Sequence, residues 1–337
     1  MTVLLITHSQ DNESISLVKK AIQERGGKVF RFDTDRFPTE ISLDIYYGKE
    51  TERLILARES EKLDLSEVSA VWYRRIRIGG RIPASIDLQL RQASLGESRA
   101  TILGAIASLQ GFHLDPMANI ERAKHKQLQL QVARKLGLAI PRTLTTNNRE
   151  AVVAFVQECE GKAIAKMLSS FAIYDEKGRE TVVFTNPVKP EDLEELEGLR
   201  FCPMTFQEQI PKVLELRATI VGKQVFTAAI DSQQLPKARY DWRRQGIALL
   251  DKWKPYQLPQ EIEKNLLALM DYFGLNYGAI DLILTPDDRH IFLEINPVGE
   301  FFWLERSPGL PISQAIAEIL LGNSENRWEL IDRSIDN

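Results

Sequence analysis

The chain has 337 residues, of which 44% are apolar and 27% charged, and a formal net charge of −4. These values predict a globular protein of two or three packed lobes and do not favour a nucleic-acid-binding protein. Cys159 and Cys202 lack a metal-binding spacing and the four histidines are scattered, so we expect reduced thiols and no zinc site. Neither a signal peptide nor a long apolar span is recognisable, which predicts a soluble cytoplasmic protein without a membrane partner.

The first part of the chain predicts a β-α-β unit. Residues 3–6 and 28–32 are typical of buried strands, and residues 15–22 have helical apolar spacing. A glycine-rich dinucleotide motif is absent from this unit. A further strand at residues 70–73 runs into Arg74, Arg75, Arg77 and Arg81, which favour a solvated loop or, alternatively, a face for phosphate or an acidic peptide.

A helix is predicted at residues 86–110, and Asp115-Pro116 then breaks the chain at the expected end of a first domain. The next predicted helix, residues 120–136, carries Lys126 near its start, where a solvated lysine is the simplest interpretation. Lys166 differs because it lies within the apolar strand predicted at residues 161–168. A buried ammonium group is costly without an anion, so Lys166 is a candidate phosphate ligand.

The segment 191–197 is acidic, with Leu193 and Leu196 at helical spacing. It predicts either an exposed amphipathic helix or a docking ridge for a basic peptide. A strand follows near residue 206, and the strand at 214–221 places Glu215 and Arg217 on one face. Residues 225–230 pair back on that strand, and the polar stretch 241–244 could bring an arginine to a site.

Two strands at residues 278–284 and 290–296 flank a turn and predict a hairpin. In the predicted register, the apolar pairs are 280 with 295, 282 with 293 and 284 with 291, while Asp281 faces Glu294. Asn296 lies on the same face. Opposed carboxylates repel unless a cation lies between them, and this oxygen-only set suits Mg²⁺. A solvated polar face is the simpler alternative. Helices are predicted at 262–273, beside this hairpin, and at 312–321.

These residues, in order, resemble the signature of the ATP-grasp ligases over residues 120–322. The matching positions are Lys126, Lys166, Gln207, Glu208, Gln209, Ile210, Glu215, Arg217, Asp281, Glu294 and Asn296. The resemblance implies an α/β (α+β) ATP-grasp fold preceded by an α/β lobe. The expected domains are residues 1–116, 117–210 and 211–325, the second with an acidic peptide-docking helix and the third with the Mg-ATP site.

Within that superfamily, the chain most closely resembles the graspetide ligases of microviridin biosynthesis. The closer match is carried by residues 7–12, 31–38, 166–172 and 241–243. Of the two microviridin ligases, the chain looks more like the one that forms esters than the one that forms amides. The resemblance therefore implies an ATP-dependent peptide ligase that closes ω-ester rings.

The resemblance also implies a role for each residue. Lys126 and Lys166 would hold phosphates, the backbone of Glu208–Gln209–Ile210 beside Gln207 would meet adenine, and Glu215 would bind the ribose. Asp281, Glu294 and Asn296 would bind Mg²⁺, and Arg217 and Arg243 would stabilise the acyl phosphate and its tetrahedral intermediate. Residues 169–178 replace the glycine-rich flap of many ATP-grasp enzymes, a departure that leaves phosphate closure undefined.

The implied partner is a ribosomal precursor peptide with a leader and a core, and related ligases are usually homodimers. The acidic side chains Glu191, Asp192 and Glu195 are the candidate leader-binding residues. Alternatives are a cyclase that forms lactams with a peptide lysine and a ligase that adds glutamate or another amino acid. A non-catalytic peptide-binding protein is disfavoured because none of the candidate Mg²⁺ or phosphate ligands is missing.

Overall fold

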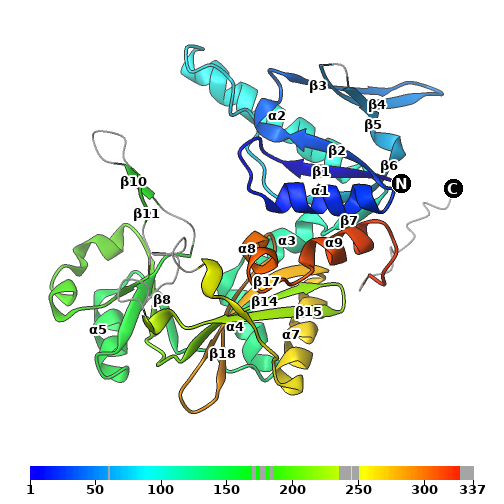
Figure 1. Ribbon diagram of the computed structural model, residues 1–337. Helices are drawn as coiled ribbons and strands as arrows, with labels where there is room; N and C mark the ends of the chain where they lie inside the picture. The colour runs from blue at the N-terminus through cyan, green and yellow to red at the C-terminus, as the bar shows by residue number, and fades with distance from the viewer. Residues whose placement is uncertain are drawn as a thin grey trace.

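The computed structural model describes all residues except 60, 169–171, 175–179, 183–184, 235–243, 245–249 and 327–337. Its first lobe contains a parallel sheet, as Figure 1 shows, which confirms the predicted β-α-β unit. The strands, in spatial order, are β2 (Lys28–Asp33), β1 (Thr2–Thr7), β6 (Val68–Tyr73) and β7 (Phe112–Leu114).

Alternation along β1 explains how two helices cover this sheet. Val3 and Leu5 pack in the core that includes α1 (Ser14–Glu24), whereas Leu4 and Ile6 pack in the core that includes α2 (Leu88–Ala107). Successive strand side chains point to opposite faces, so each helix takes one face. Both helices agree with the sequence analysis.

A second, antiparallel sheet in this lobe has no counterpart in the sequence analysis. It consists of β3 (Ile41–Tyr47), β4 (Glu52–Arg58) and β5 (Glu61–Asp64), between the short 3₁₀ helices η1 (Thr34–Arg36) and η2 (Leu65–Glu67). Only its inner residues, such as Leu56, are buried, while Tyr46 and Tyr47 at the far end of β3 are exposed.

The predicted helix at residues 120–136 is wrong as a single element. The structure has α3 (Met117–Ala123) and α4 (Lys126–Lys135) instead. The cause is Gln129, whose side-chain amide donates to the carbonyl of Ala123, the acceptor that a continuous helix would use for residue 127. Apolar periodicity passes smoothly over this break and therefore does not reveal it.

The outer lobe is a four-stranded antiparallel sheet covered by α5 (Arg149–Glu158), at the lower left of Figure 1. Its order is β12 (Asn186–Pro187), β9 (Ala163–Lys166), β13 (Met204–Glu208) and β8 (Thr143–Thr146). Lys166 is the last residue of β9 rather than an interior one. A short hairpin of β10 (Ala172–Tyr174) and β11 (Glu180–Val182) lies nearby in the chain.

The predicted acidic helix is replaced by two 3₁₀ helices, η3 (Pro190–Leu193) and η4 (Leu196–Arg200). The Asp192 carboxylate accepts a hydrogen bond from the Lys189 amide at 2.8 Å, which closes the first turn locally. Leu193 and Leu196 still pack toward the α5 core, so the apolar spacing was interpreted correctly while the helix type was not.

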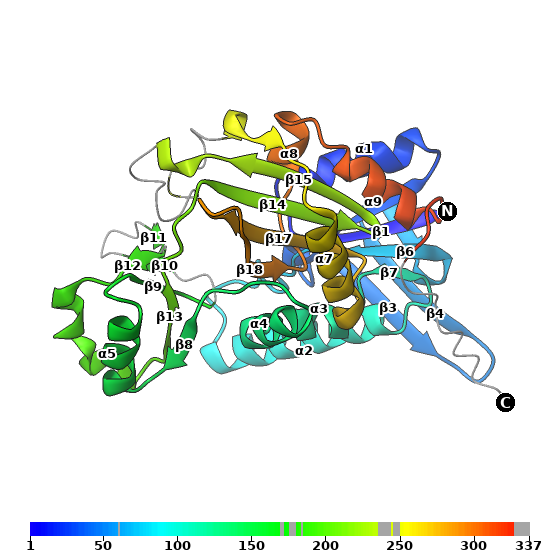
Figure 2. The same cartoon turned by 90° about the horizontal axis from the view of Figure 1, so that it is seen from below.

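The largest sheet is antiparallel and carries the central hairpin (Figure 2). Its central strand is β14 (Leu214–Val221), and alternate residues of this strand, Leu216 and Ala218 among them, share a core with α7 (Gln260–Phe273). On the other side of the sheet, α9 (Ile312–Leu320) packs against α1 of the first lobe. The remaining elements are β16 (Lys254–Pro255), β15 (Gln224–Ile230), β14 (Leu214–Val221), β17 (Tyr277–Leu284), β18 (His290–Asn296), η5 (Ser232–Gln234), η8 (Leu250–Lys252), α7 (Gln260–Phe273), α8 (Phe302–Arg306) and α9 (Ile312–Leu320).

The predicted hairpin is confirmed, but its register is only half right. Ile280 pairs with Ile295 and Asp281 with Glu294, as expected. A bulge after Asp281 then shifts the pairing, so that Leu282 faces Phe292 and Leu284 faces His290. The sequence of the turn, residues 285–289, does not encode the extra residue.

Asp115 joins the first lobe to the large sheet from a fully buried position. Its two carboxylate oxygens accept hydrogen bonds from the backbone amides of Asn276 and Tyr277, at 2.8 and 2.9 Å. Burial raises the pKa of Asp115 to about 7, although these amide hydrogen bonds limit the rise. The Asp115 carboxylate therefore binds a proton more tightly in the folded protein than in the unfolded chain.

We expect the free energy of unfolding to fall as pH rises from about 4 to about 7, because proton release from native Asp115 is unfavourable. Its contribution is complete below the unfolded pKa of 3.8 and is lost as pH passes the folded value. Asp115→Asn should remove up to ~4 kcal/mol of this dependence. Urea unfolding of both proteins at several pH values measures it; equal slopes would contradict the prediction.

Candidate active site

Three charged side chains form a row across the large sheet. Register pairs Arg217 on β14 with Asp281 on β17, and Asp281 with Glu294 on β18. Arg217 is only 8% exposed and donates to the Asp281 carboxylate at 2.6 Å. The guanidinium also lies over the Trp303 ring, 5.6 Å from its centroid. Backbone pairing thus sets these three residues side by side.

Two lysines from other elements reach the end of this row. The Lys126 ammonium, at the first residue of α4, is 3.2 Å from a Glu294 carboxylate oxygen. The Lys166 ammonium, at the end of β9, is 4.0 Å from the same oxygen. The two predicted phosphate ligands therefore converge between the outer sheet and the large sheet. The simple interpretation of Lys126 as a solvated surface lysine is wrong.

The described residues contain no cluster of three or more histidine, cysteine, aspartate or glutamate side chains placed to hold a metal ion. The predicted Mg²⁺ set contains only two carboxylates, at directly opposed positions, and Asn296, whose side-chain oxygen accepts from the Val298 amide at 3.1 Å. These oxygen donors fit Mg²⁺, which takes one or two protein carboxylates and fills its shell with water and phosphate. The positive charges of Arg217, Lys126 and Lys166 lie beside these two carboxylates and neutralise them.

Gln129 is a site residue that the sequence analysis missed. It is fully buried, donates to the carbonyl of Ile295 at 2.8 Å and accepts from the amide of Ile295 at 2.9 Å. Ile295 lies between Glu294 and Asn296, so Gln129 holds the backbone that carries both. A glutamine within an apolar helix stripe was the only available signal.

The predicted nucleotide-edge residues lie at the end of β13 and the start of β14. The Gln207 side chain is buried and donates to Thr143 at 3.0 Å, and Glu208 forms an ion pair with Arg142 at 3.1 Å. Hydrogen bonds from Arg142 hold the pKa of Glu208 below its usual value. The amides of Glu208 and Gln209 donate to the carbonyls of Arg142 and Lys162, respectively.

Glu215 lies close to a cation that the sequence analysis did not consider. Its carboxylate is 2.6 Å from the Lys212 ammonium. The predicted partner of Arg217, Arg243, lies outside the described residues, as do most of the residues that replace the flap. The candidate leader-binding residues Glu191, Asp192 and Glu195 are exposed in η3 and at the start of η4.

The expectation of a solvated loop after β6 agrees with the exposure of Arg75, Arg77 and Arg81 but is wrong for the first arginine of the run. Arg74 is 1% exposed and donates to the carbonyls of Val298 and Gly299, both at 3.0 Å. Arg75 forms an ion pair with Glu300 at 2.5 Å. Proximity in sequence to a loop did not reveal that residues 298–300 would cover these side chains.

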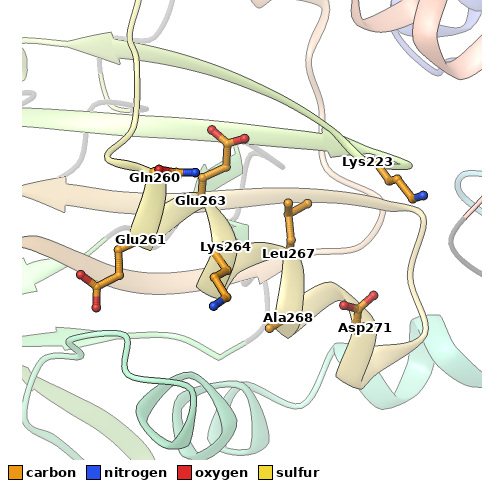
Figure 3. A pocket seen from close by; sticks show the side chains of 8 residues that line it. All are labelled: Lys223, Gln260, Glu261, Glu263, Lys264, Leu267, Ala268 and Asp271. Atoms are coloured by element: carbon orange, nitrogen blue, oxygen red, sulfur yellow. The ribbon is translucent and has the colours of Figure 1, made fainter.

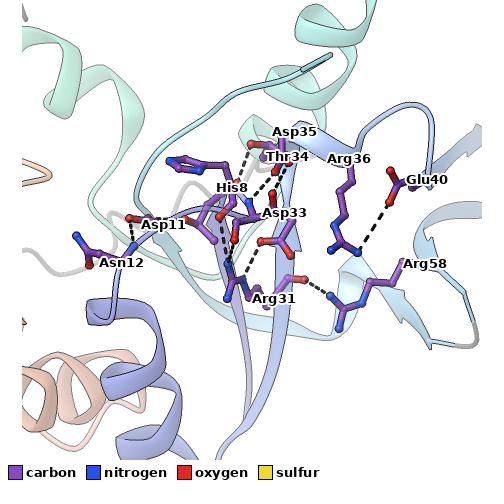
Figure 4. A network of polar contacts seen from close by, with 12 residues as sticks. His8, Asp11, Asn12, Arg31, Asp33, Thr34, Asp35, Arg36, Glu40 and Arg58 are labelled. Atoms are coloured by element: carbon purple, nitrogen blue, oxygen red, sulfur yellow. Dashed lines mark hydrogen bonds and ion pairs between the residues drawn. The ribbon is translucent and has the colours of Figure 1, made fainter. Parts of the chain in front are cut away.

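The two motifs that carried the closer resemblance in the first lobe pack together at the carboxyl ends of β1 and β2 (Figure 4). Arg31 forms an ion pair with Asp33 at 2.8 Å and donates to the carbonyl of His8 at 3.1 Å. Ser9 donates to Asp35 through its amide and hydroxyl, at 2.7 and 2.5 Å. The network ties residues 8–9 to residues 31–35 within the first lobe.

A cavity of about 1030 Å³ lies elsewhere, on the outer face of α7 (Figure 3). Side chains of α7 and Lys223 line it, and none of the predicted site residues is among them. Its lining mixes both signs of charge: Lys223, Gln260, Glu261, Glu263, Lys264, Leu267, Ala268 and Asp271. Lys166 and Glu294 meet between the two sheets, and neither residue lines this cavity.

Comparisons with known proteins indicate the class of protein to which this chain belongs. The family described as MvdD pre-ATP grasp domain matches residues 2–121. The crystal structure of macrocyclase MdnC bound with precursor peptide MdnA, from Microcystis aeruginosa MRC, is 62% identical over 96% of this chain and 100% of that one, with a TM-score of 0.87. Macrocyclase MdnB from the same organism is 39% identical over 95% and 99%, with a TM-score of 0.80.

A third structure is the RiPP-associated ATP-grasp ligase of Chryseobacterium gregarium in complex with ADP and a leader and core peptide. It is 41% identical over 97% of this chain and 98% of that one, with a TM-score of 0.93. A search of curated proteins found no match. The fold is that of an ATP-grasp ligase. The chain belongs to the microviridin-type macrocyclase family of these ligases.

Proposed function

We propose that this enzyme uses Mg²⁺ and ATP to close ω-ester rings in a ribosomal precursor peptide. The observation that carries the proposal is the convergence of Lys126, Lys166 and Arg217 on the opposed carboxylates Asp281 and Glu294. Phosphoryl transfer depends on positioning and charge neutralisation, which such a set provides. The 62% identity to a macrocyclase solved with its precursor peptide supports the peptide substrate.

The proposed reaction has two steps. A side-chain carboxylate of the peptide attacks the γ-phosphorus of ATP, giving an acyl phosphate and ADP. A Thr or Ser hydroxyl of the same peptide then attacks the acyl carbon, loses its proton and displaces inorganic phosphate. Each ring therefore consumes one ATP and removes one water from the peptide.

We assign roles to the site residues accordingly. Lys126 and Lys166 bind phosphates, and Arg217 with Arg243 stabilises the charge that develops on the acyl phosphate. Asp281, Glu294 and Asn296 hold Mg²⁺, which would neutralise phosphate charge when bound. The segment Gln207, Glu208, Gln209 and Ile210 binds adenine and Glu215 binds ribose. The division into domains 1–116, 117–210 and 211–325 is part of this proposal.

The test is ATP hydrolysis with and without a microviridin-type precursor, with the peptide mass measured in parallel. Peptide-dependent ADP release and loss of whole waters support a cyclase. Mild base then separates the bond types, because esters open and lactams survive. Product that resists base would replace the ester with the lactam-forming alternative, and turnover with free amino acids alone would indicate an amino-acid ligase.

We further propose that the leader binds the acidic surface of η3 and η4, where Glu191, Asp192 and Glu195 are exposed. Asp192→Ala should weaken leader binding roughly tenfold by removing a charge. ATP affinity without peptide should stay unchanged. Calorimetry with the isolated leader and, separately, with ATP measures the two affinities. Since Asp192 also closes the turn at Lys189, Glu195→Gln is the companion variant, and unchanged leader affinity in both would refute the assignment.

Among the described residues, no helix has the length and apolarity needed to cross a bilayer.

We propose a cytoplasmic homodimer. The first turn of α2 offers a contact surface, since Leu88 and Leu90 are 65% and 63% exposed. The double variant Leu88→Glu/Leu90→Glu should convert a dimer into a monomer. Light scattering after size exclusion gives the mass; a variant that stays dimeric would show that the interface lies elsewhere.

A further inference from the structure

The segment 298–300, between β18 and α8, is held by the first lobe. Arg74 follows the last residue of β6 and is almost fully buried. One of its terminal nitrogens donates to the carbonyls of Val298 and Gly299, both at 3.0 Å. The Tyr277 hydroxyl donates to the same Gly299 carbonyl at 2.6 Å. We call residues 298–300 the bridging loop.

The carboxylate of Glu300, in this loop, points to the same lobe. It is 2.8 Å from the second terminal nitrogen of Arg74 and 2.5 Å from Arg75. The Ser14 hydroxyl, at the start of α1, donates to its other oxygen at 3.3 Å. Arg75 also lies 3.9 Å from Asp11. Because carboxylates face both guanidinium groups, this cluster has little capacity to bind an additional anion.

The backbone of the bridging loop contacts the active-site candidate Arg217. One terminal nitrogen of Arg217 donates to Asp281 at 2.6 Å, and the other donates to the carbonyl of Glu300 at 3.3 Å. Two acceptors in different directions define the plane of the guanidinium, whereas one would leave it free to swing. The Glu300 carbonyl is itself placed by contacts that originate at Arg74.

We propose that Arg74 is a positioning residue for Arg217, acting through the bridging loop. This inference rests on the role given to Arg217 in the proposed function. Reorienting a group that stabilises the acyl phosphate changes the rate of its formation and breakdown, because a misplacement of ~1 Å can cost ~100-fold. Among the described residues, Arg74 contacts neither the carboxylates Asp281 and Glu294 nor the two lysines. Substitution of Arg74 should therefore leave the affinity for ATP unchanged.

The experiment is a double-mutant cycle. Arg74→Lys and Tyr277→Phe are each made in the native protein and in an Arg217→Lys background, and kcat and KM for ATP are measured as peptide-dependent ADP release. Each should lower kcat by ~10- to 100-fold in the native protein with KM for ATP within about twofold. In the Arg217→Lys background, each should lower kcat less than about twofold, since the positioned group is already changed.

The control is Arg31→Lys in the same lobe, since Arg31 forms an ion pair with Asp33 and has no contact with the bridging loop among the described residues. It should lower the melting temperature and leave kcat unchanged. If Arg74→Lys fails to fold, Tyr277→Phe tests the same carbonyl by deleting one hydroxyl. If Arg74→Lys and Tyr277→Phe lower kcat by the same factor in both backgrounds, the positioning role of Arg74 is overturned, while the role of Arg217 stands. Native kcat in Arg217→Lys would overturn both this inference and the role of Arg217.

Discussion

Replacing Glu294 with glutamine is expected to lower kcat/KM for Mg-ATP by about 10²- to 10³-fold. Glu294 lies opposite Asp281 in the sheet, and both lysines approach one of its oxygens. Loss of its charge removes one of the two carboxylates available to Mg²⁺. Peptide-dependent ADP release at varied Mg²⁺ concentration measures the effect.

Binding without metal distinguishes this role from simple damage to the fold. In the native protein without Mg²⁺, the Glu294 charge repels phosphate and occupies Lys126 and Lys166. Glu294→Gln should therefore bind ATP at least as tightly as native protein in EDTA, although it binds more weakly with Mg²⁺. Asp287→Asn is the matched control, because Asp287 forms an ion pair in the turn of the same hairpin. Weaker binding under both conditions would contradict the assignment.

Arg217→Met is expected to reduce peptide-dependent ADP release by about 10²- to 10³-fold, the usual effect of losing one preorganised donor at a developing negative charge. ATP affinity should change little, because the lysines and not Arg217 are assigned to the phosphates. The free energy of unfolding should fall by about 1–3 kcal/mol, a moderate loss because the Asp281 side chain is 30% exposed and keeps access to water.

Arg289→Met is the control for Arg217→Met. Arg289 also forms an ion pair with an aspartate of the same hairpin, at 2.6 Å, but its side chain is exposed. Arg289→Met should leave peptide-dependent ADP release unchanged and alter the free energy of unfolding by under about 1 kcal/mol. Single-turnover measurement of ADP and cyclised peptide adds a second readout. Native ADP release in Arg217→Met would show that the guanidinium has only a structural role.

The opposed carboxylates Asp281 and Glu294 could be predicted from the sequence. Strand alternation puts both on one face of the sheet when the hairpin closes near residues 287 and 288. Arg217 followed from alternation in β14. The roles given to these residues stay predictions. What alternation could not supply was the bulge after Asp281, since one extra residue has no marker in an otherwise regular pattern.

Contacts between distant segments account for most of what was missed. Arg74 is interpreted as solvated from its neighbours, yet residues more than 200 positions later bury it. Gln129 breaks a helix whose apolar periodicity is continuous, because its amide is drawn to Ala123 and Ile295. Such effects depend on tertiary packing, and their one local mark in the sequence is a glutamine within an apolar helix stripe.

The acidic turns η3 and η4 follow the edge strand of the outer sheet, whereas the charged row belongs to the large sheet. Among the described residues, Lys166 reaches from the outer sheet to the Glu294 carboxylate of the large sheet. The proposed leader-binding surface and the proposed site of carboxylate activation therefore lie on different sheets. We expect an exchange of residues 186–200 for those of a relative to retarget the enzyme to a foreign leader while the large sheet keeps its backbone framework.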